Sequence, residues 1–233
     1  MRLLASIFCA LMLCLCLSGG AWGDSVAIQN ASFETTNPLP PNCAGTGCAF
    51  NFAIPDWNNI SSSTAAGSFQ PGSNTLYFTS PIPDGITVAF INSGAITQTL
   101  GVSLLPNSVY TLSVDVGRRV DVVAANYSLN LLDGSNVFCT SGSNSNGSIT
   151  AGTFEDITLT CATGAAVPGG FLGIEFTGDG RQIDFDNVRL DVTGSTVSTP
   201  EPSVLVLMLT TLGLVGLLFA RSRRNHHLQV ASS

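Results

Sequence analysis

The side chains that could do chemistry in the central part of this 233-residue chain are almost all carboxylates. Residues 24–199 contain no histidine and no lysine, which removes Ser-His-Asp, Cys-His and Schiff-base catalysis. The carboxylate-pair chemistry of glycosidases remains. The acids available for such a pair are Asp115, Asp121, Asp133, Glu155, Asp156, Glu175, Asp179 and Asp184. Their spacing forms no recognisable pair, so we predict that the protein is not an enzyme, with a carboxylate-dependent glycosidase as the less favoured alternative.

The charge of residues 24–199 is strongly negative. This segment contains four arginines and 14 of the chain's 15 carboxylates, which gives a formal charge of −10. A field of this sign repels phosphate backbones, so we expect no nucleic-acid partner. A negative field is compatible with cationic or neutral sugar ligands, or it serves only to keep the protein soluble.

Four cysteines of the central part are candidates for disulfides. Cys9, Cys14 and Cys16 lie in the N-terminal apolar segment, which leaves an even set. Four cysteines allow three pairings. We favour Cys43–Cys48, which closes a short loop, and Cys139–Cys161, which joins neighbouring strands. Zinc is the rival interpretation, but the spacing is not that of a zinc site and no histidine is available.

Short β-type segments, separated by Gly, Asn, Asp, Ser and Pro, dominate residues 24–192. The clearest is 109–116, where Tyr110, Leu112, Val114 and Val116 alternate with polar residues. A period of two predicts a strand with one buried face. Other candidate strands are 26–28, 75–78, 87–91, 96–100, 127–131, 157–161, 171–176 and 183–192. About nine strands and almost no helix predict an all-β, jelly-roll β-sandwich.

The last candidate strand changes its phase. Ile183 and Phe185 are apolar at odd positions, whereas Val188, Leu190 and Val192 are apolar at even positions. A strand cannot exchange faces without an extra residue or a bend. We therefore predict a β-bulge at Asp186-Asn187, which would redirect the side chain of Asp186.

The N-terminal segment is typical of a signal peptide. Arg2 precedes an apolar run from Leu3 to Leu17, and Ala21-Trp22-Gly23 places small residues at a cleavage site after Gly23. The run is too short for an ordinary membrane span. A lipoprotein anchored through Cys16 is a weaker alternative, because the preceding Leu15 is bulky.

The C-terminal segment is typical of a membrane anchor. A small-residue linker, 193–199, leads to Pro200-Glu201-Pro202 and then to 203–220, which carries no charge and spans about 27 Å as a helix. The basic residues Arg221, Arg223 and Arg224 follow. In this sorting tail, 200–233, the positive-inside rule places the basic end after the helix 203–220 in the cytoplasm, so the β-domain lies outside.

Several short motifs of the central part resemble carbohydrate-binding modules of the galactose-binding-like jelly-roll type. They are 30–34 (Asn-Ala-Ser-Phe-Glu), 54–57 (Ile-Pro-Asp-Trp), 98–100, 107–114 and the closing 183–190. The resemblance implies a structural calcium ion near Glu34 and Asp186, with Asn30 as a further contributor; calcium prefers such hard oxygen ligands. Alternatively, Glu34 caps a turn and Asp186 accepts backbone hydrogen bonds. Sugar-stacking candidates are Trp57, Tyr77 and Phe78, although Trp57 is also suited to core packing.

The order Pro-Glu-Pro, apolar helix and arginine cluster resembles the PEP-CTERM sorting signal. The resemblance implies recognition by an exosortase-type transpeptidase of Gram-negative bacteria, export across the inner membrane, and a final location at the cell surface or outside the cell. A plain single-span anchor is the alternative, and a GPI signal is a poorer one. From these features we expect an exported carbohydrate- or exopolysaccharide-binding module. The alternative is an acidic structural protein of the surface or biofilm matrix with no specific glycan ligand.

Overall fold

The computed structural model describes residues 23–37, 48–60, 65–72 and 76–194. The chain divides after Gly194, and only the unit before this point contains described residues. The apolar segment 203–220 and the predicted sorting motif lie outside the described residues, as does the predicted signal peptide except for Gly23. None of the described residues forms a helix long and apolar enough to cross a membrane.

The described residues form eleven β-strands and one short 3₁₀-helix, η1 (Asn146–Ser148), so the predicted all-β class is confirmed. In chain order the strands are β1 (Asp24–Ser25), β2 (Ala49–Asn51), β3 (Asn58–Asn59), β4 (Ala66–Gln70), β5 (Val88–Ser103), β6 (Ser108–Arg118), β7 (Asn126–Asp133), β8 (Asn136–Thr140), β9 (Asn144–Ser145), β10 (Thr153–Ala162) and β11 (Phe171–Gly194).

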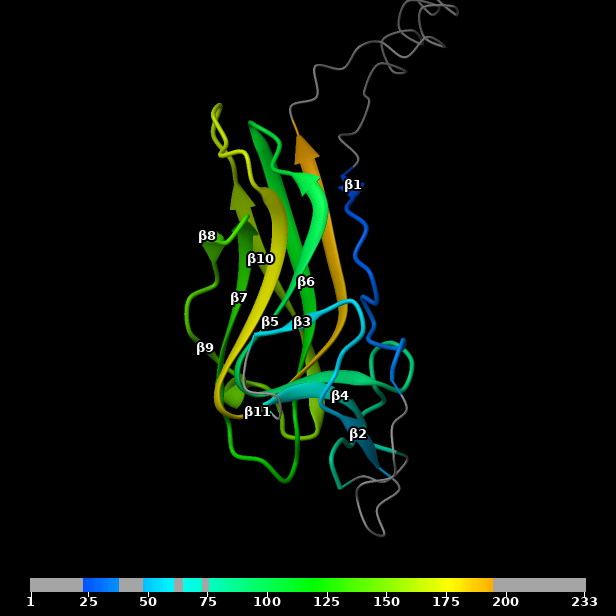
Figure 1. Ribbon diagram of the computed structural model, residues 1–233. Helices are drawn as coiled ribbons and strands as arrows, with labels where there is room; N and C mark the ends of the chain where they lie inside the picture. Colours follow the sequence, from blue (N-terminus) through cyan, green and yellow to red (C-terminus); the bar gives the residue numbers. More distant parts are fainter. Residues whose placement is uncertain (1–22, 38–47, 61–64, 73–75, 195–233) are drawn as a thin grey trace, which may run out of the picture. The chain divides into compact units, whose positions relative to one another are not determined.

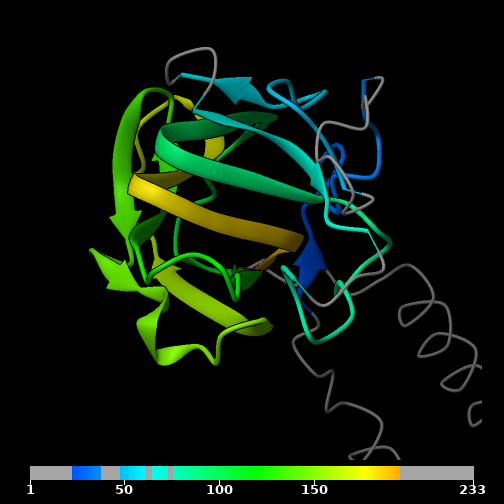
Figure 2. The same cartoon turned by 90° about the horizontal axis from the view of Figure 1, so that it is seen from below.

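The long strands β5 and β11 run antiparallel beside each other and belong to both layers of the sandwich (Figures 1 and 2). The first half of β11 pairs with β7 on its other side, and the second half pairs with β6. One layer therefore contains β8, β7 and β3, and the other contains β10, β6, β4 and β2, all joined through β5 and β11. The predicted β-sandwich is therefore present, with two strands shared between its layers.

Glycines mark the point where the shared strands bend from one layer to the other. Gly94 on β5 lies opposite Gly178 on β11, and Gly94 has a φ of 84°. Glycine adopts a positive φ without steric cost, so the backbone can turn sharply while both strands continue. The sequence predicted separate strands before and after each glycine: 87–91 and 96–100 around Gly94, and 171–176 and 183–192 around Gly178. In the structure each pair is one continuous bent strand. The expected strand 26–28 does not form, and neither do the described residues 76–78 of the expected strand 75–78; β1 begins earlier, at Asp24.

The predicted β-bulge is present. The β11–β6 register advances three residues on β11, from Asp186 to Arg189, against two on β6, from Asp115 to Ser113. Asn187 has a φ of 49°, as a bulge of this kind requires. The extra residue moves Val188, Leu190 and Val192 onto the buried face, which Ile183 and Phe185 occupy before the bulge.

The main core lies between the two layers and includes the predicted alternating residues Tyr110, Leu112, Val114 and Val116. A disulfide joins Cys139 on β8 to Cys161 on β10, as predicted, with the two Cα atoms 6.1 Å apart. It therefore links the edges of the two layers. Cys48 is also disulfide-bonded, and its predicted partner Cys43 lies outside the described residues.

Candidate functional site

A second apolar cluster lies on the outer face of the β4–β5–β11–β6–β10 layer. Alternate residues of β5 separate it from the main core: Ala89 and Ile91 face the core, whereas Val88 and Phe90 belong to the outer cluster. A hydrophobic outer face is unusual for an antiparallel layer, which is normally polar where it meets water. The outer face therefore indicates a binding site.

A row of directly paired residues crosses this face from strand to strand. Paired residues project from the same side of a sheet, so the side chains in the row share the outer face. In order across the layer, the row contains Gly67, Phe90, Asp184, Gly117 and Phe154. Asp184 is therefore the only ionisable group in the row, between an aromatic ring and a glycine.

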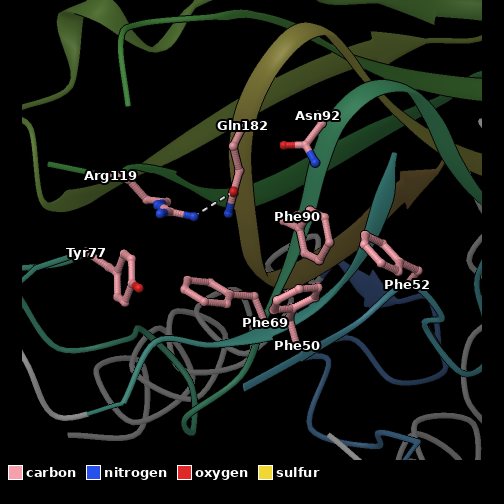
Figure 3. A pocket seen from close by; sticks show the side chains of 8 residues that line it. All are labelled: Phe50, Phe52, Phe69, Tyr77, Phe90, Asn92, Arg119 and Gln182. Atoms are coloured by element: carbon pink, nitrogen blue, oxygen red, sulfur yellow. Dashed lines mark hydrogen bonds between the residues drawn. The ribbon is translucent and has the colours of Figure 1, made fainter. Parts of the chain in front are cut away.

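A pocket of about 310 Å³ opens on this face (Figure 3). Five aromatic and three polar side chains line it. They are Phe50, Phe52, Phe69, Tyr77, Phe90, Asn92, Arg119 and Gln182. A mostly aromatic pocket with a few polar groups is typical of a site for a small organic molecule.

Edge-to-face contacts hold the aromatic side of the pocket in place. The Phe50 ring lies 5.3 Å from that of Phe52 and 6.4 Å from that of Phe90, at interplanar angles of 73° and 87°. Phe69 and Tyr77 form a similar contact at 5.3 Å. Such arrangements are favourable for the ring quadrupoles, so the rings form a rigid, shaped wall.

Arg119 forms the polar side of the pocket and is fixed from three directions. Its Nε and Nη2 donate to the two carboxylate oxygens of Asp121 at 2.9 and 2.6 Å, and its Nη1 donates to Gln182 Oε1 at 2.6 Å. The guanidinium carbon lies 4.5 Å from the centre of the Tyr77 ring and 5.2 Å from that of Phe69. The segment carrying Tyr77 is in turn attached to the end of β6, because the N–H of Val120 donates to the Tyr77 carbonyl.

Gln182 connects this arginine to Asp184. Because Arg119 only donates, it must face the amide oxygen of Gln182, and the Gln182 amide nitrogen then donates to Asp184 Oδ1 at 2.8 Å. Asp184 is completely buried, and its Oδ2 has no hydrogen-bond partner among the described residues. Burial raises the pKa of Asp184 to about 7, while the charge of Arg119 and the hydrogen bond from Gln182 act in the lowering direction. The site therefore holds a buried carboxyl group that is partly protonated near neutral pH, beside an aromatic pocket.

Asp186, the next residue on this face, is also buried, and burial raises its pKa to about 7. Its carboxylate accepts from the N–H groups of Asp84 and Asn187, which lower the pKa, while the charges of Asp84 and Asp115 raise it. It thus holds the segment 84–87 against β11.

The predicted calcium ligands Asn30, Glu34 and Asp186 have other partners in the structure. Glu34 Oε1 accepts from the N–H groups of Ile86 and Thr87, and the Asn30 side chain bonds to the backbone of Thr35 and Pro55. No group of three or more Asp, Glu, His or Cys residues in the described part of the chain is arranged to hold a metal ion. Calcium binding by these residues stays a prediction, testable by melting with calcium against chelator.

The predicted sugar-stacking residues lie in three different environments. Trp57 is in the main core, stacked on Phe176 at 5.4 Å, with its indole N–H donating to the Asn30 carbonyl. Phe78 is buried against Phe154 at 4.6 Å and does not line the pocket. Of the three, Tyr77 alone lines it. The phenylalanines, Arg119 and Gln182 were not predicted, because strands from distant parts of the sequence bring them together.

Comparison with known proteins then decides the family. The sequence profile of the HpiC1-like family (HpiC1 cyclase) matches residues 24–191, which is most of the chain. The chain belongs to this HpiC1-like cyclase family. No curated protein sequence matches it.

The solved structures most useful for comparison are cyclases from Fischerella sp. TAU. One is 26% identical, with a TM-score of 0.58, and the match covers 75% of this chain and all of that one. The Stig cyclase FisC, in complex with (3Z)-3-(1-methyl-2-pyrrolidinylidene)-3H-indole, is 25% identical with a TM-score of 0.59, over 73% and 98% of the two chains. A third structure, in complex with 4-(1H-indol-3-yl)butan-2-one, is 26% identical with a TM-score of 0.58, over 74% and 100%.

Membership of the HpiC1-like family corrects two predictions. A non-catalytic carbohydrate-binding module is wrong, and so is the conclusion that the protein is not an enzyme. The exopolysaccharide and biofilm association that accompanied it has no support. A xylan-binding domain of Paenibacillus barcinonensis matches with 11% identity and a TM-score of 0.47, over 75% of this chain and 97% of that one. The prediction of no enzymatic activity considered only catalysis by histidine, by lysine or by a pair of carboxylates. It did not consider catalysis by a single buried carboxylic acid.

Proposed function

We propose that this protein is a cyclase that uses Asp184 as a proton donor to a small, largely apolar substrate in the Phe50–Arg119 pocket. The observation that carries the proposal is the buried Asp184 carboxyl group between Phe90 and Gln182, two residues that both line the pocket. Membership of the HpiC1-like cyclase family supports it.

The chemistry needs no group beyond those on this face. The Asp184 O–H bond breaks, its proton passes to an unsaturated carbon of the substrate, and a cation results. A second π bond of the substrate attacks this cation, closes the ring by a new C–C bond, and leaves a cation that returns a proton to the Asp184 carboxylate. The sequence is a redox-neutral isomerisation that regenerates the acid.

Several features of the pocket support this reaction. A carboxylic acid with a pKa near 7 is partly protonated at neutral pH and still releases its proton readily. The aromatic faces of Phe50, Phe52 and Phe90 stabilise a passing cation by their negative quadrupole faces. The apolar walls also keep out water, which would otherwise capture the cation.

For the substrate we propose a molecule that carries a planar aromatic group such as indole. Two of the related cyclases were crystallised with indole compounds, and the pocket volume of about 310 Å³ suits a molecule of this size. The test is binding of 4-(1H-indol-3-yl)butan-2-one by calorimetry, followed by turnover of unsaturated indole substrates. Asp184→Asn should still bind the ketone and should lose cyclisation, because an amide has no acidic proton to give. Full cyclisation by Asp184→Asn would exclude this residue as the acid.

We also propose that the domain works outside the cytosol. The Cys139–Cys161 disulfide supports this location, because such bonds persist in oxidising compartments. Recognition of the C-terminal segment by an exosortase-type enzyme, and its anchoring in the membrane, stay predictions for residues outside the described part. Intact mass and fractionation of the exported protein test both ends together.

A further inference from the structure

We propose that Arg119 anchors the substrate by donating a hydrogen bond to a neutral acceptor group, such as a carbonyl or nitrile, attached to its apolar skeleton. This inference deepens the proposed function and rests on it. It concerns how the pocket selects and orients the substrate, whereas the proposed function concerns the transfer of a proton from Asp184.

The donor count of the guanidinium is the first argument. Arginine has five N–H groups, and within the described residues three of them donate to Asp121 and Gln182. One N–H on each terminal nitrogen is left, on a side chain that lines the pocket and is only 13% exposed. A donor in such a place is costly to leave without an acceptor, so a ligand that supplies one is favoured over one that does not.

The rigidity of the guanidinium is the second argument. Asp121 accepts from Nε and Nη2 along one edge of the guanidinium, Gln182 accepts from Nη1, and Tyr77 and Phe69 lie against the group. A donor fixed before binding loses little conformational freedom when the ligand arrives. Arg119 and Gln182 lie together on one side of the pocket in Figure 3, with Phe50, Phe52 and Phe90 on the other, so an acceptor at the arginine directs the apolar part toward these three rings.

The charge around Arg119 decides that the acceptor is neutral. Asp121 already forms a bidentate ion pair with Arg119, and residues 24–199 carry a formal charge of −10. A carboxylate ligand would enter next to Asp121 and the buried Asp184 without an unpaired cation to receive it. A carbonyl or nitrile accepts the remaining N–H groups without this cost.

Three indole compounds of nearly equal size test the proposal on the unmodified protein. They are 4-(1H-indol-3-yl)butan-2-one, 3-butyl-1H-indole, in which a methylene replaces the carbonyl, and 3-(1H-indol-3-yl)propanoic acid. We expect the ketone to bind about 10-fold more tightly than butylindole and more tightly than the acid. Equal binding of ketone and butylindole would overturn the Arg119 anchor and leave the proposed pocket standing. Tightest binding by the acid would overturn the neutral-acceptor assignment.

Two variants test whether the difference in affinity between the ketone and butylindole depends on Arg119. In Arg119→Met the ketone should lose its advantage over butylindole to within about 2-fold, because the donor is gone while the apolar walls remain. Arg181→Met is the matched control: it removes the same charge at an exposed position on β11, outside the pocket lining, and should retain the full 10-fold advantage. An advantage that survives in Arg119→Met would overturn the proposal.

A second readout keeps the test independent of how well the variant folds. Arginine labelled with ¹⁵N gives few side-chain signals, since the whole chain contains eight arginines, four of them in residues 24–199. The Arg119 signal of the unmodified protein should shift with the ketone and not with butylindole. No binding of any indole compound would refute the proposed function itself, a result distinct from binding without discrimination.

Discussion

Gly117 on β6 lies directly beside Asp184 on β11, and the Phe154 ring fills the space into which a side chain at Gly117 would project. A Cβ atom added to Gly117 would lie 2.5 Å from the nearest carbon of that ring. Phe154 in turn stacks on Phe78 at 4.6 Å. The absence of a side chain at Gly117 thus allows an aromatic ring to close over the sheet next to the buried acid.

Gly117→Ala should therefore destabilise the protein by about 1–3 kcal/mol, because Phe154 and its partner Phe78 must move. Urea denaturation measures the change. Gly169→Ala is the control, since nothing lies within 4 Å of a Cβ at this position and its stability should change by less than about 0.5 kcal/mol. Equal effects at the two glycines would contradict the close packing described.

The free energy of unfolding should fall as the pH rises from about 4 to about 7. Asp184 has a raised pKa, about 7 against an ordinary 3.8, so the unfolded chain releases this proton at a lower pH than the folded protein does. The contribution of Asp184 is fully present below about pH 4 and is lost as the pH rises through 7, a change of about 4 kcal/mol. Asp186 acts in the same direction.

Urea denaturation at several pH values measures this dependence. Asp184→Asn should reduce the slope between pH 4 and 7, since its amide does not titrate. A stability that rises over this range and is indifferent to the substitution would contradict the burial of a protonated carboxyl group at this site.

Replacing both Cys139 and Cys161 by serine should lower the free energy of unfolding by about 3 kcal/mol. The disulfide closes a loop with a sequence separation of 22 and links the edge strands β8 and β10. Its loss restores conformational freedom to the unfolded chain. The double substitution is preferable to a reducing agent, because Cys48 is disulfide-bonded as well. An unchanged denaturation midpoint would show that the link contributes nothing.

Trp57→Ala should cost about 3–5 kcal/mol, because Trp57 fills the main core against Phe33 and Phe176. Trp57→Phe should cost less and should leave binding of 4-(1H-indol-3-yl)butan-2-one unchanged, since Trp57 belongs to the main core and does not line the pocket. Thermal melting and calorimetry separate the two effects. Loss of ketone binding in a fully stable Trp57→Phe variant would show that the ketone binds at a site that depends on Trp57, and would contradict binding in the Phe50–Arg119 pocket.

The sequence by itself determined the features that depend on local pattern. Alternation in 109–116 predicted which face of β6 is buried, and the change of phase after Phe185 predicted the bulge at Asp186-Asn187. Cysteine parity, together with the short Cys43–Cys48 loop, predicted the Cys139–Cys161 link, although the two strands it joins were expected to be neighbours and lie in different layers. Each of these follows from the two-residue period of a strand or from short separations along the chain.

Only the tertiary structure decided where the chemistry lies. Phe90, Gly117, Phe154 and Asp184 come from four strands, and their alignment depends on a register that no local pattern encodes. Among the fourteen acids of the central part, we propose Asp184 as the proton donor because it alone lies in the row between Phe90 and Gly117, where burial raises its pKa to about 7. In the sequence Asp184 is indistinguishable from exposed acids of the same strand, such as Asp179 and Asp191, because burial is a property of the assembled sheet.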